Sequence, residues 1–250
     1  MAHLEINLFS KILNRSTDIT LILPSDYFQS DFQLEYSKTH YQDKANKKMP
    51  LLILLHGYLG DHHSWCQYTS VERYAEENQI AVVMISGENQ YFLNNQYIRW
   101  YDFIEEELKD YLYGNFPISN KREDNFIAGL SMGGYGALFH GLSNPKAYSA
   151  IGAFSPATRA ANLSKNGMIV ENPSLKSLVK KNKRDLPNIY LAIGSEDFLL
   201  PQNENFIKFL EENYIVSTHE IVQGYKHEWS FWDMELNKFM KSLKNLRKPI

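Results

Sequence analysis

One serine in the chain has the surroundings of an enzyme nucleophile. Ser131 is the centre of a Gly-x-Ser-x-Gly pattern, bounded by Gly129 and Gly133, which follows a short apolar run and precedes a small-residue helical pattern. A serine in a tight turn between strand and helix stands exposed above the sheet, and the helix N-terminus favours negative charge that develops there. Larger residues at 129 and 133 would collide with neighbouring backbone, which glycine avoids. The pattern predicts a nucleophile elbow; the alternative is an ordinary Gly-rich loop.

A serine hydroxyl attacks at neutral pH only with the help of a base, and the base needs an acid that orients it. Behind such an elbow the acid and then the base follow the serine along the chain. Of the three histidines after Ser131, His140 falls within the elbow helix and His219 within a strand-like run, whereas His227 follows that run in a loop. We predict that His227 is the base.

The acid is expected at the end of the strand that precedes this histidine. The apolar run 189–193 leads into a loop that offers Glu196 and Asp197. Asp197 adjoins the apolar residues 198–201, which would exclude water and strengthen its hydrogen bond to an imidazole. We therefore predict Asp197 as the acid, with Glu196 as the alternative.

Attack on a carbonyl creates an oxyanion that needs two backbone N–H donors. One is expected from Met132, the residue after the nucleophile. The other is expected from the glycine-containing loop 56–60, where Tyr58 is the first choice and Leu59 the second. His56 in the same loop precedes the serine, so we interpret it as a support for the loop and not as the base.

Other chemically suggestive residues are better explained without a ligand. Asp61, His62 and His63 are metal-ligand types, but no third and fourth ligand has suitable spacing, so we predict polar residues at the surface or site rim and no metal or other cofactor. Large apolar side chains could line an acyl or alcohol pocket, although aromatic residues at these spacings are more often core. The pocket candidates are Leu59, Trp65, Trp100, Trp229 and Trp232.

Size and composition are those of one globular domain. The 250 residues are 44% hydrophobic and 22% charged, with a net charge of −3, which gives no electrostatic reason to expect nucleic acid or a membrane surface as partner. Cys66 is the only cysteine, so no internal disulfide is possible. With no signal-peptide pattern and no apolar run of transmembrane length, we expect a cytoplasmic protein. From the predicted nucleophile we expect a small-molecule ester as its partner, and the sequence leaves open whether the chain forms a homo-oligomer.

The pattern of short apolar runs alternating with amphipathic segments predicts a mostly parallel, twisted central sheet with helices on both faces. Together with the elbow at Ser131, it predicts the α/β-hydrolase fold. The expected strands are 4–9, 18–24, 51–55, 80–85, 126–128, 150–154, 189–193 and 217–222. The expected helices are 97–113, 134–142, 204–214 and 229–243. Residues 26–48 are expected to form a surface loop, and residues 157–187 a small cap-like insertion in an otherwise single domain, 1–250.

Together these residues resemble the tributyrin esterase group of the esterase D-like putative esterase family. The resemblance spans nearly the whole chain. It is carried by the segments Leu55–Gly57, Gly60-Asp61, Ser64-Trp65, Gly129–Gly134, Gly194–Phe198, His227–Trp229 and Phe231–Asp233. It implies a serine carboxylesterase with Ser131 as nucleophile, Asp197 as acid, His227 as base, and Tyr58 and Met132 as oxyanion donors.

The resemblance further implies hydrolysis of short-chain acyl esters, acetyl to butyryl, including acetylated sugars or aryl esters, through an acyl-enzyme. An S-formylglutathione hydrolase or an acyltransferase on the same scaffold is the first alternative. A catalytically inactive hydrolase fold used for binding is the second, although such proteins usually lose one of the three catalytic residues, and none is lost here.

Overall fold

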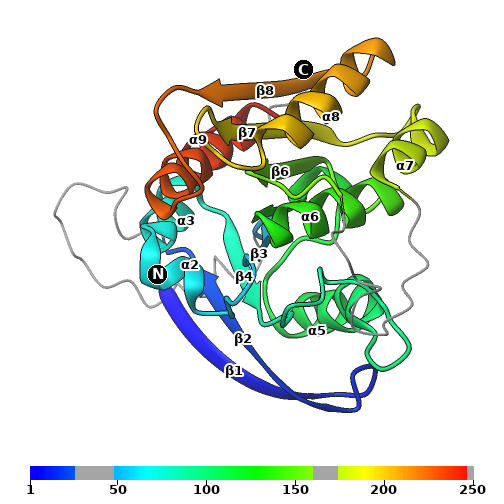
Figure 1. Cartoon of the computed structure of the whole chain (residues 1–250). Helices are drawn as coiled ribbons and strands as arrows, with labels where there is room; N and C mark the ends of the chain where they lie inside the picture. Colours follow the sequence, from blue (N-terminus) through cyan, green and yellow to red (C-terminus); the bar gives the residue numbers. More distant parts are fainter. Residues whose placement is uncertain (26–47, 160–173, 247–250) are drawn as a thin grey trace, which may run out of the picture.

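Eight strands form one sheet that runs through the middle of the molecule (Figure 1). The computed structural model describes residues 1–25, 48–159 and 174–246. The strand order is β1-β2-β4-β3-β5-β6-β7-β8. The strands are β1 (Ala2–Ser10), β2 (Arg15–Leu23), β3 (Leu51–Leu55), β4 (Ala81–Ile85), β5 (Asn125–Leu130), β6 (Ala150–Phe154), β7 (Asn188–Gly194) and β8 (Ser217–Val222). This order and its helices are those of the predicted α/β-hydrolase fold.

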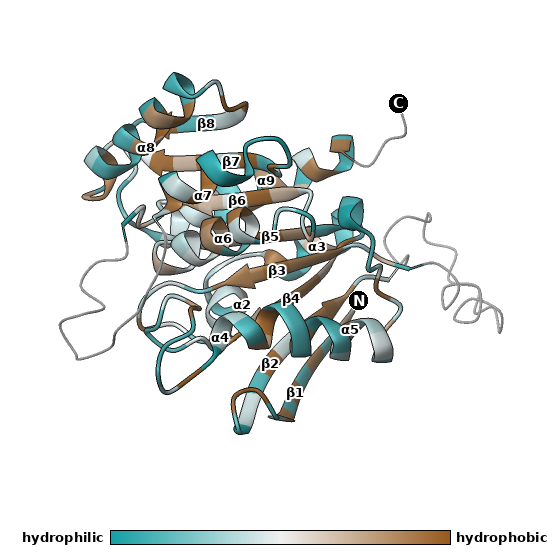
Figure 2. Cartoon of the chain, turned by 90° about the vertical axis from the view of Figure 1, so that its right-hand side faces the viewer, coloured by the Kyte–Doolittle hydropathy of each residue, from teal (hydrophilic) through white to brown (hydrophobic). Residues whose placement is uncertain are grey.

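The sheet is antiparallel at one edge and parallel elsewhere. β1 and β2 form a hairpin, β2 pairs antiparallel with β4, and all pairs from β4 to β8 are parallel. Every residue of β3, β4, β5 and β6 is buried, as expected of parallel strands covered on both faces. Hydrophobic colouring accordingly runs along the central strand β3 in Figure 2.

Successive side chains along each strand point to opposite faces of the sheet, and each face contributes to a separate hydrophobic core. In β3, Leu51, Ile53 and Leu55 belong to one core, whereas Leu52 and Leu54 belong to the other. The first core is covered by α4 (Trp100–Asp102), η2 (Phe103–Leu108), α5 (Lys109–Asn115), α6 (Met132–Ser143), α7 (Leu175–Asn182) and α8 (Leu200–Glu212). The second core is covered by α2 (Ser64–Tyr68), α3 (Val71–Asn78) and α9 (Trp229–Leu246). A short 3₁₀ helix, η3 (Arg122–Asp124), leads into β5.

The predicted helix at 97–113 differs from the observed one. The helical stretch begins at Trp100 and ends at Asn115, and its middle part, η2, is a π-helix. Tyr97 was expected on the buried face, but it precedes the helix and is 81% exposed. The wider π-turns shift which side chains face inward, and a pattern read at 3.6 residues per turn does not predict that shift.

Other differences concern ends and short helices. α8 begins at Leu200, four residues before the predicted start, with Pro201 in its first turn. The short helices α2 and α3 are absent from the sequence prediction, because five and eight residues carry too little periodicity. The remaining predicted strands and helices are present, with ends shifted by a few residues.

Two predicted segments fall almost wholly or partly outside the described residues. Only the last residue of the expected surface loop, 26–48, is among the described residues, and residues 160–173 of the expected cap-like insertion are not described either. The described end of that insertion contains α7, whose Leu175, Leu178 and Val179 join the first core beside α6. The cap-like role of 157–187 stays a prediction.

Among the helices of the described segments, none combines the length and the apolar character needed to cross a membrane.

Candidate active site

Ser131 sits at a sharp turn between β5 and α6. Its backbone has φ 53° and ψ −113°, a conformation that side-chain-bearing residues rarely adopt. Neighbouring backbone over-determines this turn: the Ser131 N–H donates to the Phe154 carbonyl (2.9 Å), and the Ser131 carbonyl accepts from Tyr135 (3.1 Å) and Ala157 (3.0 Å). The strained serine is therefore held at the carboxyl end of the central strands, above the N-terminus of α6.

The glycines on either side of the serine are required by close backbone contacts. A Cβ atom on Gly129 would lie 2.4 Å from the Gly133 carbonyl oxygen. One on Gly133 would lie 2.4 Å from the carbonyl oxygens of both Leu55 and His56. No side chain fits at such distances, and the obstructing atoms are backbone, so they cannot swing aside.

Residues far apart in the sequence meet the serine hydroxyl. His227, in the loop between β8 and α9, places Nε2 3.0 Å from Ser131 Oγ and Nδ1 2.8 Å from Asp197 Oδ2. In the tautomer that this arrangement favours, Nδ1–H donates to the carboxylate and Nε2 accepts from the serine. The His227 side chain is partly exposed, whereas the Asp197 side chain is completely buried.

The other two histidines after Ser131 lie elsewhere. His140 is fully buried; its Nδ1 lies 2.6 Å from Glu105 Oε1 and its Nε2 2.9 Å from the Phe92 carbonyl. His219 lies on the edge strand β8, 3.4 Å from Glu211. Neither faces the serine, in agreement with the sequence argument.

Asp197 is held as an anion in the interior. Burial would raise its pKa, but hydrogen bonds from His227, from the Leu199 N–H and from the Ser155 hydroxyl outweigh that effect and hold the pKa below its ordinary value. The Leu199 N–H donates to Oδ1 at 2.8 Å, which leaves Oδ2 for the imidazole. The alternative acid, Glu196, is largely exposed and lies 3.9 Å from Lys226.

Ser155 is a site residue that the sequence reasoning missed. It follows β6 with φ 45°, is fully buried, and its Oγ accepts a hydrogen bond from Trp232 Nε1 at 3.1 Å while facing Asp197. The ring of Trp232 packs edge-on against His227 with centroids 4.9 Å apart. The only signal in the sequence was a serine directly after a predicted strand, which does not distinguish it from an ordinary loop residue.

The loop after β3 presents a backbone N–H beside the elbow. Residues 57–60 form a turn in which the Gly60 N–H donates to the Gly57 carbonyl (3.1 Å). The Leu59 N–H is taken by the side chain of Asn89 (2.8 Å), whereas the described residues offer the Tyr58 N–H no acceptor. This favours Tyr58 over Leu59 as oxyanion donor; the second predicted donor, Met132, is the first residue of α6. Asn89 had no signal in the sequence.

His56 supports this loop, as expected from the sequence. Its Nε2 accepts from the Gly87 N–H (2.9 Å), and its Nδ1 lies 2.6 Å from the Gly57 carbonyl, to which it donates. Burial lowers the pKa of His56, so the ring is neutral and its two contacts fix one tautomer.

Two of the predicted pocket residues are core residues. Trp65 and Trp100 have no exposed surface: Trp65 donates from Nε1 to the Leu55 carbonyl in the second core, and Trp100 packs on Phe103 in the first. Both large rings are needed to fill the space between sheet and helices, so neither offers a wall to a substrate.

The other pocket candidates remain near solvent or near the histidine. Leu59 is 80% exposed at the tip of its turn. Trp229 is half-buried and stacks on the exposed ring of Tyr68, with centroids 4.8 Å apart, and Trp232 is buried against His227.

Known proteins resemble this chain in sequence and in fold. Residues 10–243 match the family model described as Putative esterase. An acetyl esterase from Caldicellulosiruptor saccharolyticus is 33% identical over 260 residues, which cover 93% of this chain and 94% of that protein. The two proteins therefore correspond over nearly their whole lengths.

Two solved structures from Staphylococcus aureus share the fold throughout. The fluorophosphonate-binding serine hydrolase FphF is 28% identical, with a TM-score of 0.84 and 99% coverage of each chain. The S-formylglutathione hydrolase FrmB is 26% identical, with a TM-score of 0.78, covering 97% of this chain and 96% of that one. The chain therefore belongs to the Putative esterase family, and it is a serine esterase, a hydrolase of carboxylic esters.

Proposed function

We propose that this enzyme hydrolyses short-chain acyl esters, acetyl to butyryl, and that Ser131, His227 and Asp197 carry out the reaction. The observation that carries the proposal is the continuous chain of contacts from Ser131 Oγ to His227 Nε2 (3.0 Å) and from His227 Nδ1 to Asp197 (2.8 Å). The likeness to a curated acetyl esterase supports the short acyl group.

In the first half of the reaction, His227 Nε2 takes the proton of Ser131 as Oγ attacks the ester carbonyl. The carbonyl oxygen becomes an anion, which the N–H groups of Tyr58 and Met132 stabilise. His227 then gives its proton to the departing alcohol oxygen, the carbon–oxygen bond of the ester breaks, and the acyl group stays on Ser131.

In the second half, water replaces the alcohol. His227 removes a proton from the water as the water oxygen attacks the carbonyl carbon of the acyl-enzyme. It then returns that proton to Ser131 Oγ as the carboxylic acid product leaves. Asp197 keeps its negative charge throughout and stabilises the imidazolium, which is why its buried, hydrogen-bonded setting matters.

The test is a comparison of kcat/KM for p-nitrophenyl acetate, butyrate and octanoate. We expect the highest value on acetate or butyrate. Comparable values on octanoate would contradict the short-chain proposal while leaving esterase activity intact.

S-formylglutathione hydrolysis is the second candidate, favoured by the fold and 26% identity shared with FrmB. It uses the same attack with a thiolate as leaving group. A kcat/KM on S-formylglutathione far above that on the p-nitrophenyl esters would establish it in place of the ester activity. Transfer of the acyl group to an added alcohol would appear as a new ester product.

The cytoplasmic location and the possible homo-oligomer stay predictions. A single cysteine suits a reducing compartment. Cell fractionation and light scattering on the purified protein would test the two respectively.

A further inference from the structure

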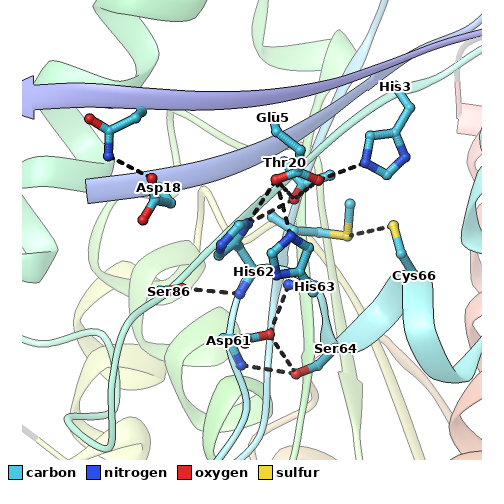
Figure 3. A network of polar contacts seen from close by, with 12 residues as sticks. His3, Glu5, Asp18, Thr20, Asp61, His62, His63, Ser64, Cys66 and Ser86 are labelled. Carbon is cyan, nitrogen blue, oxygen red and sulfur yellow. Dashed lines mark hydrogen bonds and ion pairs between the residues drawn. The ribbon is translucent and has the colours of Figure 1, made fainter. Parts of the chain in front are cut away.

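Glu5 meets two adjacent histidines from a distant part of the sequence, His62 and His63, beside the N-terminus of α2 (Figure 3). Glu5 projects from β1, and His62 and His63 precede α2. Glu5 Oε2 lies 3.4 Å from His62 Nδ1 and 3.2 Å from His63 Nε2, and one ligand atom from each residue lies within 4.8 Å of the other two. The sequence argument against a metal was the lack of further ligands at suitable spacing. The β1–β2 hairpin supplies one from 57 positions away.

We propose that Glu5, His62 and His63 form a binding site for a divalent transition metal ion of the zinc type. Two imidazole nitrogens and one carboxylate oxygen are a donor set that such ions bind, usually with water in the fourth position. Ligand bonds of about 2.0–2.2 Å in a tetrahedron put ligand atoms roughly 3.3–3.6 Å apart. The two distances from Glu5 Oε2 to the histidine nitrogens, 3.4 and 3.2 Å, lie close to this separation, so small side-chain adjustments would accommodate the ion.

Neighbouring groups orient the carboxylate for this role. His3 Nε2 lies 2.7 Å from Glu5 Oε1, which leaves Oε2 for the ion. The Thr20 hydroxyl lies 2.8 Å from His62 Nδ1 and 3.1 Å from Glu5 Oε1. The Thr20 hydroxyl can therefore donate its one hydrogen bond to Glu5 Oε1 when a metal occupies His62 Nδ1. Such contacts around the ligands are typical of metal sites.

Solvent can reach the cluster. The side chains of Glu5 and His63 are 44% and 42% exposed, whereas that of His62 is only 11% exposed. An ion could enter from the surface and would tie the edge strand β1 to the loop that follows β3.

An adjacent group, His3, Cys66 and Glu72, is the weaker candidate. Burial raises the pKa of the Cys66 thiol to about 12, so the thiolate that a metal requires is scarce at neutral pH. The same chain therefore offers a specific comparison: Cys66→Ser should leave binding at the Glu5 site unchanged.

The test is equilibrium dialysis of tag-free, chelator-treated protein against Zn²⁺, with Co²⁺ absorption as a spectroscopic probe. We expect one Zn²⁺ per chain with a micromolar or lower Kd, and Co²⁺ bands displaced by Zn²⁺. Glu5→Gln and His63→Gln, whose side chains are both partly exposed, should each weaken binding at least about tenfold. Mg²⁺, a hard cation that prefers oxygen ligands, should not compete.

The matched control is His219→Gln, which removes another exposed histidine beside a single glutamate. It should bind Zn²⁺ as the unaltered protein does. The titration is repeated with His227→Gln, and unchanged Zn²⁺ affinity in that variant would exclude the His227 imidazole as the ligand. Absence of stoichiometric binding, or equal affinity in Glu5→Gln and His63→Gln, would overturn the proposal and leave the cluster as a hydrogen-bonded network only.

A melting experiment gives a second readout. At Zn²⁺ far above Kd, the Tm of the unaltered protein and of His219→Gln should rise by about 5 °C or more, because the ion binds only the folded chain. The Tm of His63→Gln should rise less at the same Zn²⁺ concentration, because weaker binding stabilises the folded chain less. An equal rise in all variants would show that Zn²⁺ acts elsewhere.

Discussion

The hydroxyl of Ser155 holds the buried carboxylate of Asp197 in place. It faces Asp197 and accepts from Trp232 Nε1, so it links the carboxylate to the ring that packs on His227. Ser155→Ala would leave Asp197 and the Trp232 N–H each short of one partner. We expect kcat/KM to fall about tenfold, corresponding to about 1.4 kcal/mol, measured on p-nitrophenyl acetate.

Ser195→Ala is the control for that change. Ser195 lies in the Asp197 loop, but its hydroxyl accepts from the Gly224 N–H. Its kinetics should match those of the unaltered enzyme. If Ser155→Ala and Ser195→Ala behaved alike, Ser155 would have no positioning role.

Asn89 is expected to set the shape of the oxyanion turn. Its side chain accepts from the Leu59 N–H, which leaves the Tyr58 N–H as the proposed oxyanion donor of this turn. Asn89→Ala would release the turn, and we expect kcat to fall about fivefold with a smaller change in KM, since one hydrogen bond contributes about 1 kcal/mol. Initial rates over a range of substrate concentrations separate the two constants. A change confined to KM would mean that Asn89 affects substrate binding only.

At the scale of elements, the turn between β5 and α6 depends on backbone contact. In Gly133→Ala the new methyl would overlap the carbonyl oxygens of Leu55 and His56. We expect a loss of more than about 3 kcal/mol in the free energy of unfolding, or failure to fold, because backbone must shift. Urea denaturation would measure it.

Gly114→Ala is the matched control, in α5, where an added Cβ meets nothing within 4 Å. It should leave stability unchanged or raise it by about 0.5 kcal/mol. If Gly133→Ala were as stable as Gly114→Ala, the turn would be far more adaptable than its contacts indicate.

The elements that the sequence predicted well are those whose patterns reflect burial directly. The apolar runs at β3 and β4 and the Gly-x-Ser-x-Gly turn were predicted because central parallel strands and tight turns permit few residue types. The π-turns of η2 and the strained backbone at Ser155 were not, since both arise from tertiary packing and leave no periodic signal.

At the scale of the whole molecule, a buried ionic network joins the helix layer of the first core. Glu105 contacts His140 Nδ1 (2.6 Å), Lys109 Nζ (2.6 Å) and the Tyr148 hydroxyl (2.6 Å). Burial would raise the pKa of Glu105, but His140 and Lys109 lower it to about 2. Burial also lowers the pKa of Lys109 despite Glu105, so the network contributes less than the Glu105 shift alone implies.

Stability should therefore depend on Glu105 in a pH-dependent way. Its pKa is lower in the folded state than in the unfolded one, so its contribution is fully present above about pH 4.5 and is lost as the pH falls toward 2. We expect Glu105→Gln to cost about 3 kcal/mol at pH 7, with a smaller gap from the unaltered protein at pH 3. Urea denaturation at both pH values, with the exposed Glu106→Gln as control, checks this. A gap independent of pH would contradict the account.

Long-range contacts mark the limit of what the sequence could predict. The contacts among Ser131, His227 and Asp197 were predictable because the order of these residues along the chain follows the elbow. The approach of Glu5 to His62 and His63 was not, since it depends on how the β1–β2 hairpin pairs with β4. Trp65 and Trp100 were misjudged for a related reason: an aromatic residue near the site in sequence can still be needed in the core.

The central claim is that Ser131 is the nucleophile, and the most direct measurement is covalent labelling by a fluorophosphonate followed by peptide mass spectrometry. We predict one adduct per chain, on Ser131, and neither adduct nor measurable ester hydrolysis in Ser131→Ala, with at least a 10³-fold loss of kcat/KM. Ser242→Ala, a remote serine in α9, should label and turn over normally. Labelling on another residue, or hydrolysis by Ser131→Ala at the unaltered rate, would contradict the account.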